Sequence, residues 1–352
     1  MTGSVHARHS VVRGAGGQAR SALALGVGLL LVSAVLLLLG SAAGSTGFES
    51  VRQLFGAGHD SVAWQIVWDI RLPRTAGAWL SGALLGLAGA VAQGLFRNPL
   101  ADPYLLGSAS GASLGVAAAM ALWGVSPLAT QWFARIGMTG AAFVGAVAAV
   151  LLTLALARGV QHTLRLLLAG VIVGVVLGAM TALIMLLVPE VQASLQAFML
   201  GSTAFVGWSS CALMAAAWLA CMVVAWMLSH ALDGLALGEA TALSLGLPLP
   251  AMRAALVVVI ALATGTAVAQ TGLIAFVGLA APHLVRSVVK TTHGRLTLLS
   301  SLTGGVLLLA ADVLARALIA PQELPVGVLT AVLGGSYLLW LMHRRAVSGQ
   351  GL

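Results

Sequence analysis

Residues 166–188 read LLLAGVIVGVVLGAMTALIMLLV, without one charged side chain. A helix needs about 20 apolar residues to cross the roughly 30 Å of hydrocarbon in a bilayer. This run has the required length and composition, so it predicts a transmembrane helix.

The rest of the chain repeats this composition. Of its 352 residues, 60% are hydrophobic and 7% are charged, and the mean hydropathy is +1.05. Soluble domains carry about 25% charged residues, so lipid is the expected solvent of this chain. We predict an all-α polytopic membrane protein with about ten transmembrane helices. The predicted spans lie near residues 21–43, 75–95, 104–123, 136–157, 166–188, 208–230, 251–270, 272–288, 296–315 and 326–342.

The ten-helix membrane domain is expected over residues 21–342, between a basic cytoplasmic segment at 1–20 and a cytoplasmic tail at 343–352. The first apolar run follows Arg8, Arg13 and Arg20, as the apolar part of a signal peptide could. Its length of about twenty residues is too great for a signal peptide. We therefore expect this run to be retained as a helix.

The basic residues predict on which side of the membrane each end lies. Ten spans place both termini on one side, and cytoplasmic loops carry the excess of Arg and Lys. With a cytoplasmic N-terminus, most basic residues lie inside, so both termini are expected there. The net charge of +8 is scattered between apolar runs, so no nucleic-acid partner is expected. The basic residues left outside are Arg52, Arg71, Arg74, Arg135 and Arg316.

Small residues recur at helical spacing within the predicted spans. Gly170, Gly174 and Gly178 line up on one face of the fifth span, where we expect a neighbouring helix to pack closely. Two shorter pairs indicate helix packing in general and no particular function. They are Gly82 with Gly86, and Gly111 with Gly115.

The sequence lacks the devices that power transport. Its only lysine, Lys290, follows two valines instead of a glycine-rich turn, so the phosphate-binding loop of an ATPase is absent. The predicted spans carry no acid near their middles, where the coupling carboxylate of an ion-driven carrier would lie. Energy is therefore expected from a partner, which this chain must bind.

Several polar or reactive side chains have plain interpretations. Asp312 lies one helical turn from Arg316 near the predicted outer boundary, where either a salt bridge or a functional role fits. His283 has no clustered second ligand, which favours a hydrogen-bonded structural histidine over a metal or haem ligand. Cys211 and Cys221 lie in an apolar run, as small buried hydrophobes do. No metal site is predicted.

Several short motifs occur in a fixed order along the chain. They are Arg71-Leu-Pro-Arg74, Gly89-Ala-Val-Ala-Gln93, Asn98-Pro99-Leu-Ala-Asp-Pro103, Leu106-Gly107, Leu235-Ala-Leu-Gly-Glu-Ala-Thr-Ala-Leu-Ser-Leu-Gly246, Phe276-Val-Gly-Leu-Ala-Ala-Pro282-His283, Arg286, Asp312 with Arg316, and Glu323-Leu-Pro-Val-Gly327. With these motifs, the chain from about residue 60 to 342 closely resembles the permease subunits of bacterial ABC importers for iron chelates, haem and cobalamin. It departs at Thr271-Gly-Leu-Ile, where similar permeases often have Gly-Pro-Ile, and near Gly335-Ser336-Tyr337, where they often have Ala-Pro before an aromatic residue.

The resemblance implies a type II importer. Such permeases form homodimers with the translocation path between the two subunits, and they bind no cofactor and carry no catalytic residue. Two cytoplasmic ATP-binding subunits, which hold ATP and Mg, and a periplasmic substrate-binding protein complete the assembly in the bacterial inner membrane. Overall similarity favours haem as the cargo, while a siderophore or cobalamin remains an alternative.

The resemblance also assigns two binding surfaces. A short cytoplasmic helix at about 236–247 is expected to insert into a cleft of the ATPase, with a plain connecting turn as the alternative. On the outer face, Arg71, Arg74 and Arg316 are expected to meet acidic groups of the binding protein, with anchoring at lipid headgroups as the alternative. The residues of the expected coupling helix are Leu237, Gly238, Glu239, Ala240, Leu243 and Gly246.

Two other classes of protein share part of this pattern. A secondary transporter driven by a proton or sodium gradient would need a buried carboxylate, which the predicted spans lack. A membrane scaffold or receptor would account for the hydrophobicity, but not for a coupling helix and an outer face marked by arginines. Both classes fit the sequence less well than the importer permease.

Overall fold

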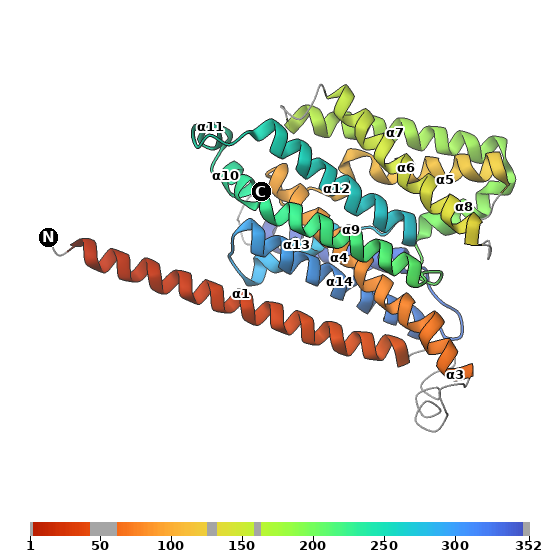
Figure 1. Cartoon of the computed structure of the whole chain (residues 1–352), viewed down its shortest axis with the longest axis horizontal. Helices are drawn as coiled ribbons and strands as arrows, with labels where there is room; N and C mark the ends of the chain where they lie inside the picture. The colour runs from red at the N-terminus through yellow and green to blue at the C-terminus, as the bar shows by residue number, and fades with distance from the viewer. Residues whose placement is uncertain (1–2, 43–61, 125–131, 158–162, 348–352) are drawn as a thin grey trace.

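The computed structural model describes residues 3–42, 62–124, 132–157 and 163–347, and its regular elements there are all helical. Most helices lie roughly along one direction, and α1 follows one side of the bundle (Figure 1). The helices that match the ten predicted spans are α1 (Gly3–Ala42), α4 (Leu72–Leu95), α5 (Ser108–Trp123), α6 (Trp132–Leu156), α7 (Thr163–Leu187), α9 (Trp208–Met227), α12 (Leu249–Thr271), α13 (Val277–Val288), α14 (His293–Ala317) and α15 (Val326–Val347).

Short helices connect these spans. Within the described residues, seven helices are long and apolar enough to cross a membrane, while α5 and the apolar part of α15, Val326–Trp340, are shorter. The polytopic, all-α prediction is therefore confirmed. The connecting helices are α3 (Val62–Gln65), a π-helix (Ile66–Arg71), 3₁₀-helices at Pro103–Leu106 and Pro189–Val191, α8 (Gln192–Leu200), α10 (Ser229–Ala236) and α11 (Glu239–Ser244).

The eighth predicted span, 272–288, is wrong at its start. Its helix, α13, has only 12 residues, or about 18 Å at 1.5 Å per residue, which is too short to cross the hydrocarbon. The preceding backbone pairs with the segment after α8: Ser202 N donates to Thr271 O at 2.8 Å, and Leu273 N donates to Phe198 O at 3.3 Å. Gly272, at φ +70°, lies so close that a Cβ would be 2.2 Å from Phe198 O.

Glycines set the distance between the central helices. Helix α4 is largely buried and packs most extensively against α14. A Cβ on Gly82 would lie 2.2 Å from Gly304 O of α14, and a Cβ on Gly86 would lie 2.2 Å from Ser300 O. Gly111 of α5 is in similarly close contact with Gly145 of α6. The two shorter glycine pairs therefore mark close helix packing.

The longer glycine pattern on α7 packs at one end only. A Cβ on Gly170 would lie 2.0 Å from Leu105 O, but nothing lies within 4 Å of the corresponding position on Gly178. The prediction of a close neighbour along the whole face is therefore wrong within this chain. The reason is that α7 meets the short 3₁₀-helix at 103–106 and α5 near its first half, and then diverges from them.

Helix α1 begins at Gly3 and runs through residues that were expected to precede the first span. Its apolar part, Ala19–Ala42, has the length of a membrane span. It contacts α14, and Trp79 Nε1 of α4 donates to Ser33 Oγ of α1 at 2.9 Å. Arg52, Arg158 and the last residues of the predicted tail, 348–352, lie outside the described residues.

The bundle has two ends, which we name by residues found there. At the Arg74 end, α1, α12 and α14 finish while α4 and α9 begin; at the α11 end, α10 and α11 connect α9 to α12 (Figure 1). Trp68 packs against Trp64 and Trp208 at the Arg74 end, with ring centroids 6.3 and 5.4 Å apart. Tryptophans gather at membrane–water interfaces, so this cluster is typical of a helix end at the bilayer boundary.

Candidate functional site

A buried cluster of charges lies at the Arg74 end. Asp312 is 0% exposed, and both of its oxygens are engaged. Arg74 Nη2 lies 3.2 Å from Asp312 Oδ1, and Arg316 Nη2 lies 2.6 Å from Asp312 Oδ2. Thr203 Oγ1 also donates to Asp312 Oδ1. Arg74 reaches outward as well, since its Nη1 lies 2.9 Å from Oε2 of Glu323, which is exposed.

The cluster is electrically balanced, with two arginines and two carboxylates. Charged groups are tolerated away from water only when opposite charges and hydrogen bonds compensate them. The expected pair of Asp312 and Arg316 is confirmed, but Asp312 is a buried group that joins two arginines, and it lies deeper than the helix-end position expected. Since each carboxylate oxygen of Asp312 is bound to an arginine, this side chain holds α4 and α14 together at the Arg74 end.

Arginines of this end also hold α1 in place. Arg316 Nη1 donates to Gly40 O at 2.8 Å, and Arg71 Nη1 donates to Ala42 O at 3.2 Å. These carbonyls belong to the last turn of α1, where backbone acceptors lack helical partners and the helix dipole favours a cation. The two arginines therefore fasten the end of α1 to α4 and α14.

The three arginines expected to bind a partner do lie together, but they are not the exposed charges that this expectation assumed. Arg71 is 9% exposed and Arg316 is 4% exposed, while the Arg74 side chain is 11% exposed. That assumption is wrong because α1 and the acids of α14 and its following loop cover them. Arg74 is paired with a carboxylate at the surface, that of Glu323.

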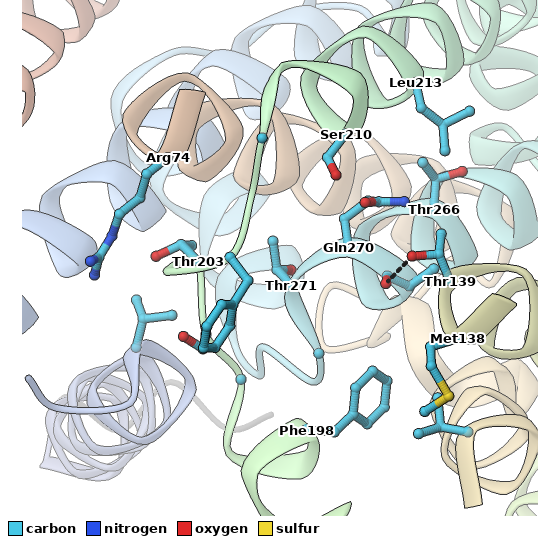
Figure 2. A pocket seen from close by; sticks show the side chains of 18 of the residues that line it. Arg74, Met138, Thr139, Phe198, Thr203, Ser210, Leu213, Thr266, Gln270 and Thr271 are labelled. Carbon is cyan, nitrogen blue, oxygen red and sulfur yellow. Dashed lines mark hydrogen bonds between the residues drawn. The ribbon is translucent and has the colours of Figure 1, made fainter. Parts of the chain in front are cut away.

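A cavity of about 900 Å³ adjoins this cluster (Figure 2). Helices α6, α9 and α12 and the segment after α8 form its walls. Apolar side chains dominate the walls, and a row of uncharged polar groups follows α12. The apolar lining includes Met138, Phe143, Phe198, Phe205, Leu213 and Leu262, and the polar lining includes Thr139, Ser210, Thr266 and Gln270.

Three of these polar side chains make no hydrogen bond among the described residues. The Thr266 hydroxyl is buried within the protein yet borders the cavity, as do the Gln270 amide and the Ser210 hydroxyl. Backbone and side-chain polar groups inside a membrane protein are normally satisfied by protein or by water in a cavity. The cavity is therefore suited to water or to a solute with neutral hydrogen-bonding groups. Among the described residues, no group of three or more His, Cys, Asp or Glu could hold a metal ion.

A second, smaller cavity of about 260 Å³ lies at the α11 end. It brings Gln93, Asn98 and Pro99 together with Arg286, which is distant in sequence; all four belong to the expected structural motif. Gln93 Nε2 donates to Leu279 O at 3.1 Å, and Arg286 Nη1 donates to Gln93 Oε1. Gln93 thereby joins α4 to α13 at two positions.

Other motif residues lie beside this cavity or further into α13. Asp102 accepts the Tyr104 N–H at 2.8 Å; burial raises the pKa of this carboxyl group, and the hydrogen bond opposes the rise. Pro282 lies inside α13, and His283, 9% exposed, packs edge-on against Tyr337 at 6.0 Å between ring centroids. This setting agrees with a structural histidine.

The expected coupling helix is shorter than 236–247. Helix α10 ends at Ala236, Gly238 has φ +110°, and α11 covers only Glu239–Ser244 before Gly246 at φ +76°. The two positive φ values suit glycine and bound the helix at each side. Leu237, Leu243 and Leu245 are 70%, 55% and 63% exposed, and Ala240 is exposed beside them.

Glu239 has a partner inside the chain. Its Oε2 lies 3.0 Å from Nη2 of Arg253, whose side chain is 5% exposed. Sequence reasoning placed Glu239 on the expected coupling helix but missed Arg253, which stands in the first turn of α12. The sequence offers little sign of this pair: Glu239 precedes a turn, and Arg253 lies shortly after the start of the next helix.

Together, the multi-span all-helical bundle and its ends define a membrane permease. A solved structure described as a metal-chelate type ABC transporter in an inward-facing conformation has a TM-score of 0.79, with 28% identity, over 91% of this chain and 98% of that chain. The model of the FecCD transport family matches residues 29–344. The chain belongs to the FecCD transport family, whose members are permease subunits of ABC transporters without catalytic residues.

Curated relatives agree with this assignment. The chain is 37% identical over 330 residues to the hemin transport system permease protein HmuU of Yersinia pestis, covering 92% of this chain and 97% of the relative. It is 42% identical over 286 residues to the vitamin B12 import system permease protein BtuC of Salmonella paratyphi A, covering 80% and 84%. The predicted resemblance is therefore confirmed.

Proposed function

We propose that this chain is the translocation subunit of an ATP-driven importer that carries haem into the bacterial cytoplasm. The observation that carries the proposal is the similarity to a hemin permease over nearly the whole of both chains. The vitamin B12 permease has a higher identity to this chain than the hemin permease, but over a shorter stretch, so cobalamin is the second candidate cargo. An iron siderophore is the third.

Two ATP-binding subunits are expected at the α11 end. Exposed leucines on a short helix, which water does not favour, support this docking site. This end then faces the cytoplasm, as the distribution of basic residues also favours. A homodimer with the path between its two copies, in the inner membrane, completes the proposed permease.

The periplasmic binding protein is expected at the Arg74 end. Arg74 is the arginine best placed to meet an acidic partner, because the carboxylate that it holds there, Glu323, lies at the surface. An incoming carboxylate would take the place of Glu323. Arg71 and Arg316 would support this site from below by holding α1 and Asp312.

Reconstitution tests the proposal. The permease, its ATPase subunits and its binding protein are placed in liposomes, and uptake of haem, cobalamin and a ferric hydroxamate is followed with and without ATP. We expect ATP-dependent uptake of haem. Uptake by the permease alone under a proton or sodium gradient would instead identify a secondary transporter. ATP-dependent uptake of cobalamin without haem would show that cobalamin is the cargo.

A further inference from the structure

Two acids near α11 are paired with the first turns of two long helices. Glu239 pairs with Arg253 of α12, and Asp233 pairs with His293 of α14. We propose that Asp233 and Glu239 are positioning residues: they attach the α10–α11 unit (residues 229–246) to α14 and α12, so that these helices follow its movement. The proposal rests on the ATPase docking proposed above.

The contact of Glu239 points inward. Arg253 is nearly fully buried, so the Glu239 carboxylate that lies 3.0 Å from it is turned toward the bundle, whereas the neighbouring leucines are exposed. A buried arginine needs an opposite charge more than a solvated acid does. The surface of α11 that remains for a partner is thus chiefly apolar, and the charge of Glu239 serves the chain itself.

Asp233 makes a double contact with the start of α14. Its Oδ1 accepts the backbone N–H of His293 at 3.0 Å and lies 2.7 Å from His293 Nδ1. The first N–H groups of a helix lack helical acceptors, and the helix dipole favours an anion there. Asp233 therefore caps α14 from a different element, and it keeps this attachment when His293 is neutral.

The α10–α11 unit is compact enough to move as one piece. Ala242 of α11 is fully buried, and a Cβ on Gly234 of α10 would lie 3.7 Å from Ala242 Cβ. The two acids flank the turn at Leu237 and Gly238. A force on the exposed leucines would therefore reach both contacts, Glu239 with Arg253 and Asp233 with His293, at once.

The attached helices carry the effect to the other end of the bundle. Helices α12 and α14, with 23 and 25 residues, extend about 35 Å each. The far end of α12 lines the 900 Å³ cavity through Gln270 and Thr271, and the far end of α14 bears Asp312 and Arg316. The Glu239–Arg253 and Asp233–His293 contacts thus connect the proposed ATPase site to the 900 Å³ cavity and to the charge cluster at the Arg74 end.

The test uses the complete importer in liposomes with haem as the probe. In Glu239→Gln, the side chain keeps its shape and loses the charge that holds Arg253. We expect the ratio of haem imported to ATP hydrolysed to fall about fivefold, as the loss of one partly buried ion pair allows. The affinity for the ATPase subunits should stay within about twofold of that of the parent. Glu190→Gln, which neutralises an exposed acid elsewhere, should leave the ratio unchanged.

Rescue separates a positioning role from a contact with the ATPase. Glu239→Arg combined with Arg253→Glu rebuilds the pair with reversed charges and should restore most of the ratio. Melting temperatures of the purified variants identify any that fail to fold; Asp233→Asn, which should also lower the ratio, then serves as the second variant. The proposal is overturned by a parent-like ratio in folded Glu239→Gln and Asp233→Asn, or by lost ATPase affinity that the reversal does not restore.

Leu243→Asp tests the underlying docking site separately. If this variant binds the ATPase subunits as the parent does, the proposed docking on α11 is wrong, whatever the Glu239 variants show. If it loses them while Glu239→Gln keeps them, the docking stands and the import ratio alone decides the positioning role.

Discussion

At the Arg74 end, single side chains join elements that lie far apart in the sequence. Asp312 binds Arg74, Arg316 and Thr203, and so joins α4, α14 and the segment before α9. Glu323 adds a surface carboxylate to the same cluster. The cluster therefore combines a buried structural centre with one arginine that is accessible through an exchangeable partner.

Replacing Asp312 should destabilise the protein strongly. Asp312→Asn keeps the shape but leaves two arginines without their buried counterion, and breaking a buried pair in this way costs about 3–5 kcal/mol. We expect a clear fall in the melting temperature of the detergent-purified permease. Glu323→Gln, at the surface, should lower it far less; equal effects of the two would show that burial does not set the strength of this cluster.

Removing the internal competitor should strengthen docking at Arg74. In Glu323→Gln, Arg74 loses its surface carboxylate, so affinity for the binding protein should rise about two- to fivefold, as expected for an exposed ion pair. Arg74→Gln should weaken it by a similar factor. Surface plasmon resonance across salt concentrations measures both, and an unchanged affinity in both variants would remove Arg74 from the interface.

The distance between packed helices depends on where glycine permits close approach. Helices α4 and α14 meet at Gly82, Gly86 and Gly304, where backbone contacts backbone. The similar pattern on α7 meets a neighbour at Gly170 and open space at Gly178. The same sequence signal thus has different consequences, which depend on what lies opposite.

Matched alanine substitutions test this difference between helices. In Gly82→Ala, the new methyl group would collide with Gly304 O, and such overpacking costs about 1–3 kcal/mol or more. Gly178→Ala meets nothing and gains helix propensity, so its stability should be unchanged or up to about 1 kcal/mol higher. Thermal unfolding in detergent should rank the two variants in this order.

At the scale of the molecule, the two ends carry different chemistry. The α11 end presents exposed leucines and ion pairs that bind long helices, whereas the Arg74 end holds a balanced charge cluster beside a large cavity. The uncharged polar row on α12 gives the cavity a hydrogen-bonding side without a metal-binding group among the described residues.

Making the α12 wall of the cavity more apolar should slow transport without unfolding the protein. The double variant Thr266→Val and Gln270→Leu removes two unpartnered polar groups while keeping side-chain volume, so stability should stay within about 1 kcal/mol of the parent or rise. We expect the haem uptake rate to fall several-fold at unchanged ATPase association. Parent-like uptake at all haem concentrations would show that cargo and its water do not contact this wall.

Fold class, approximate spans and family follow from the amino-acid sequence, because apolar runs of membrane length and closely spaced motifs are local signals. How residues distant in the chain combine follows from helix packing: Arg74 with Asp312 and Glu323, Glu239 with Arg253, and Asp233 with His293. Packing also buries arginines expected at the surface, and the eighth helix begins at Val277 instead of residue 272. Charges and glycines act through what faces them across the bundle, and that neighbour is set by packing, not by position in the chain.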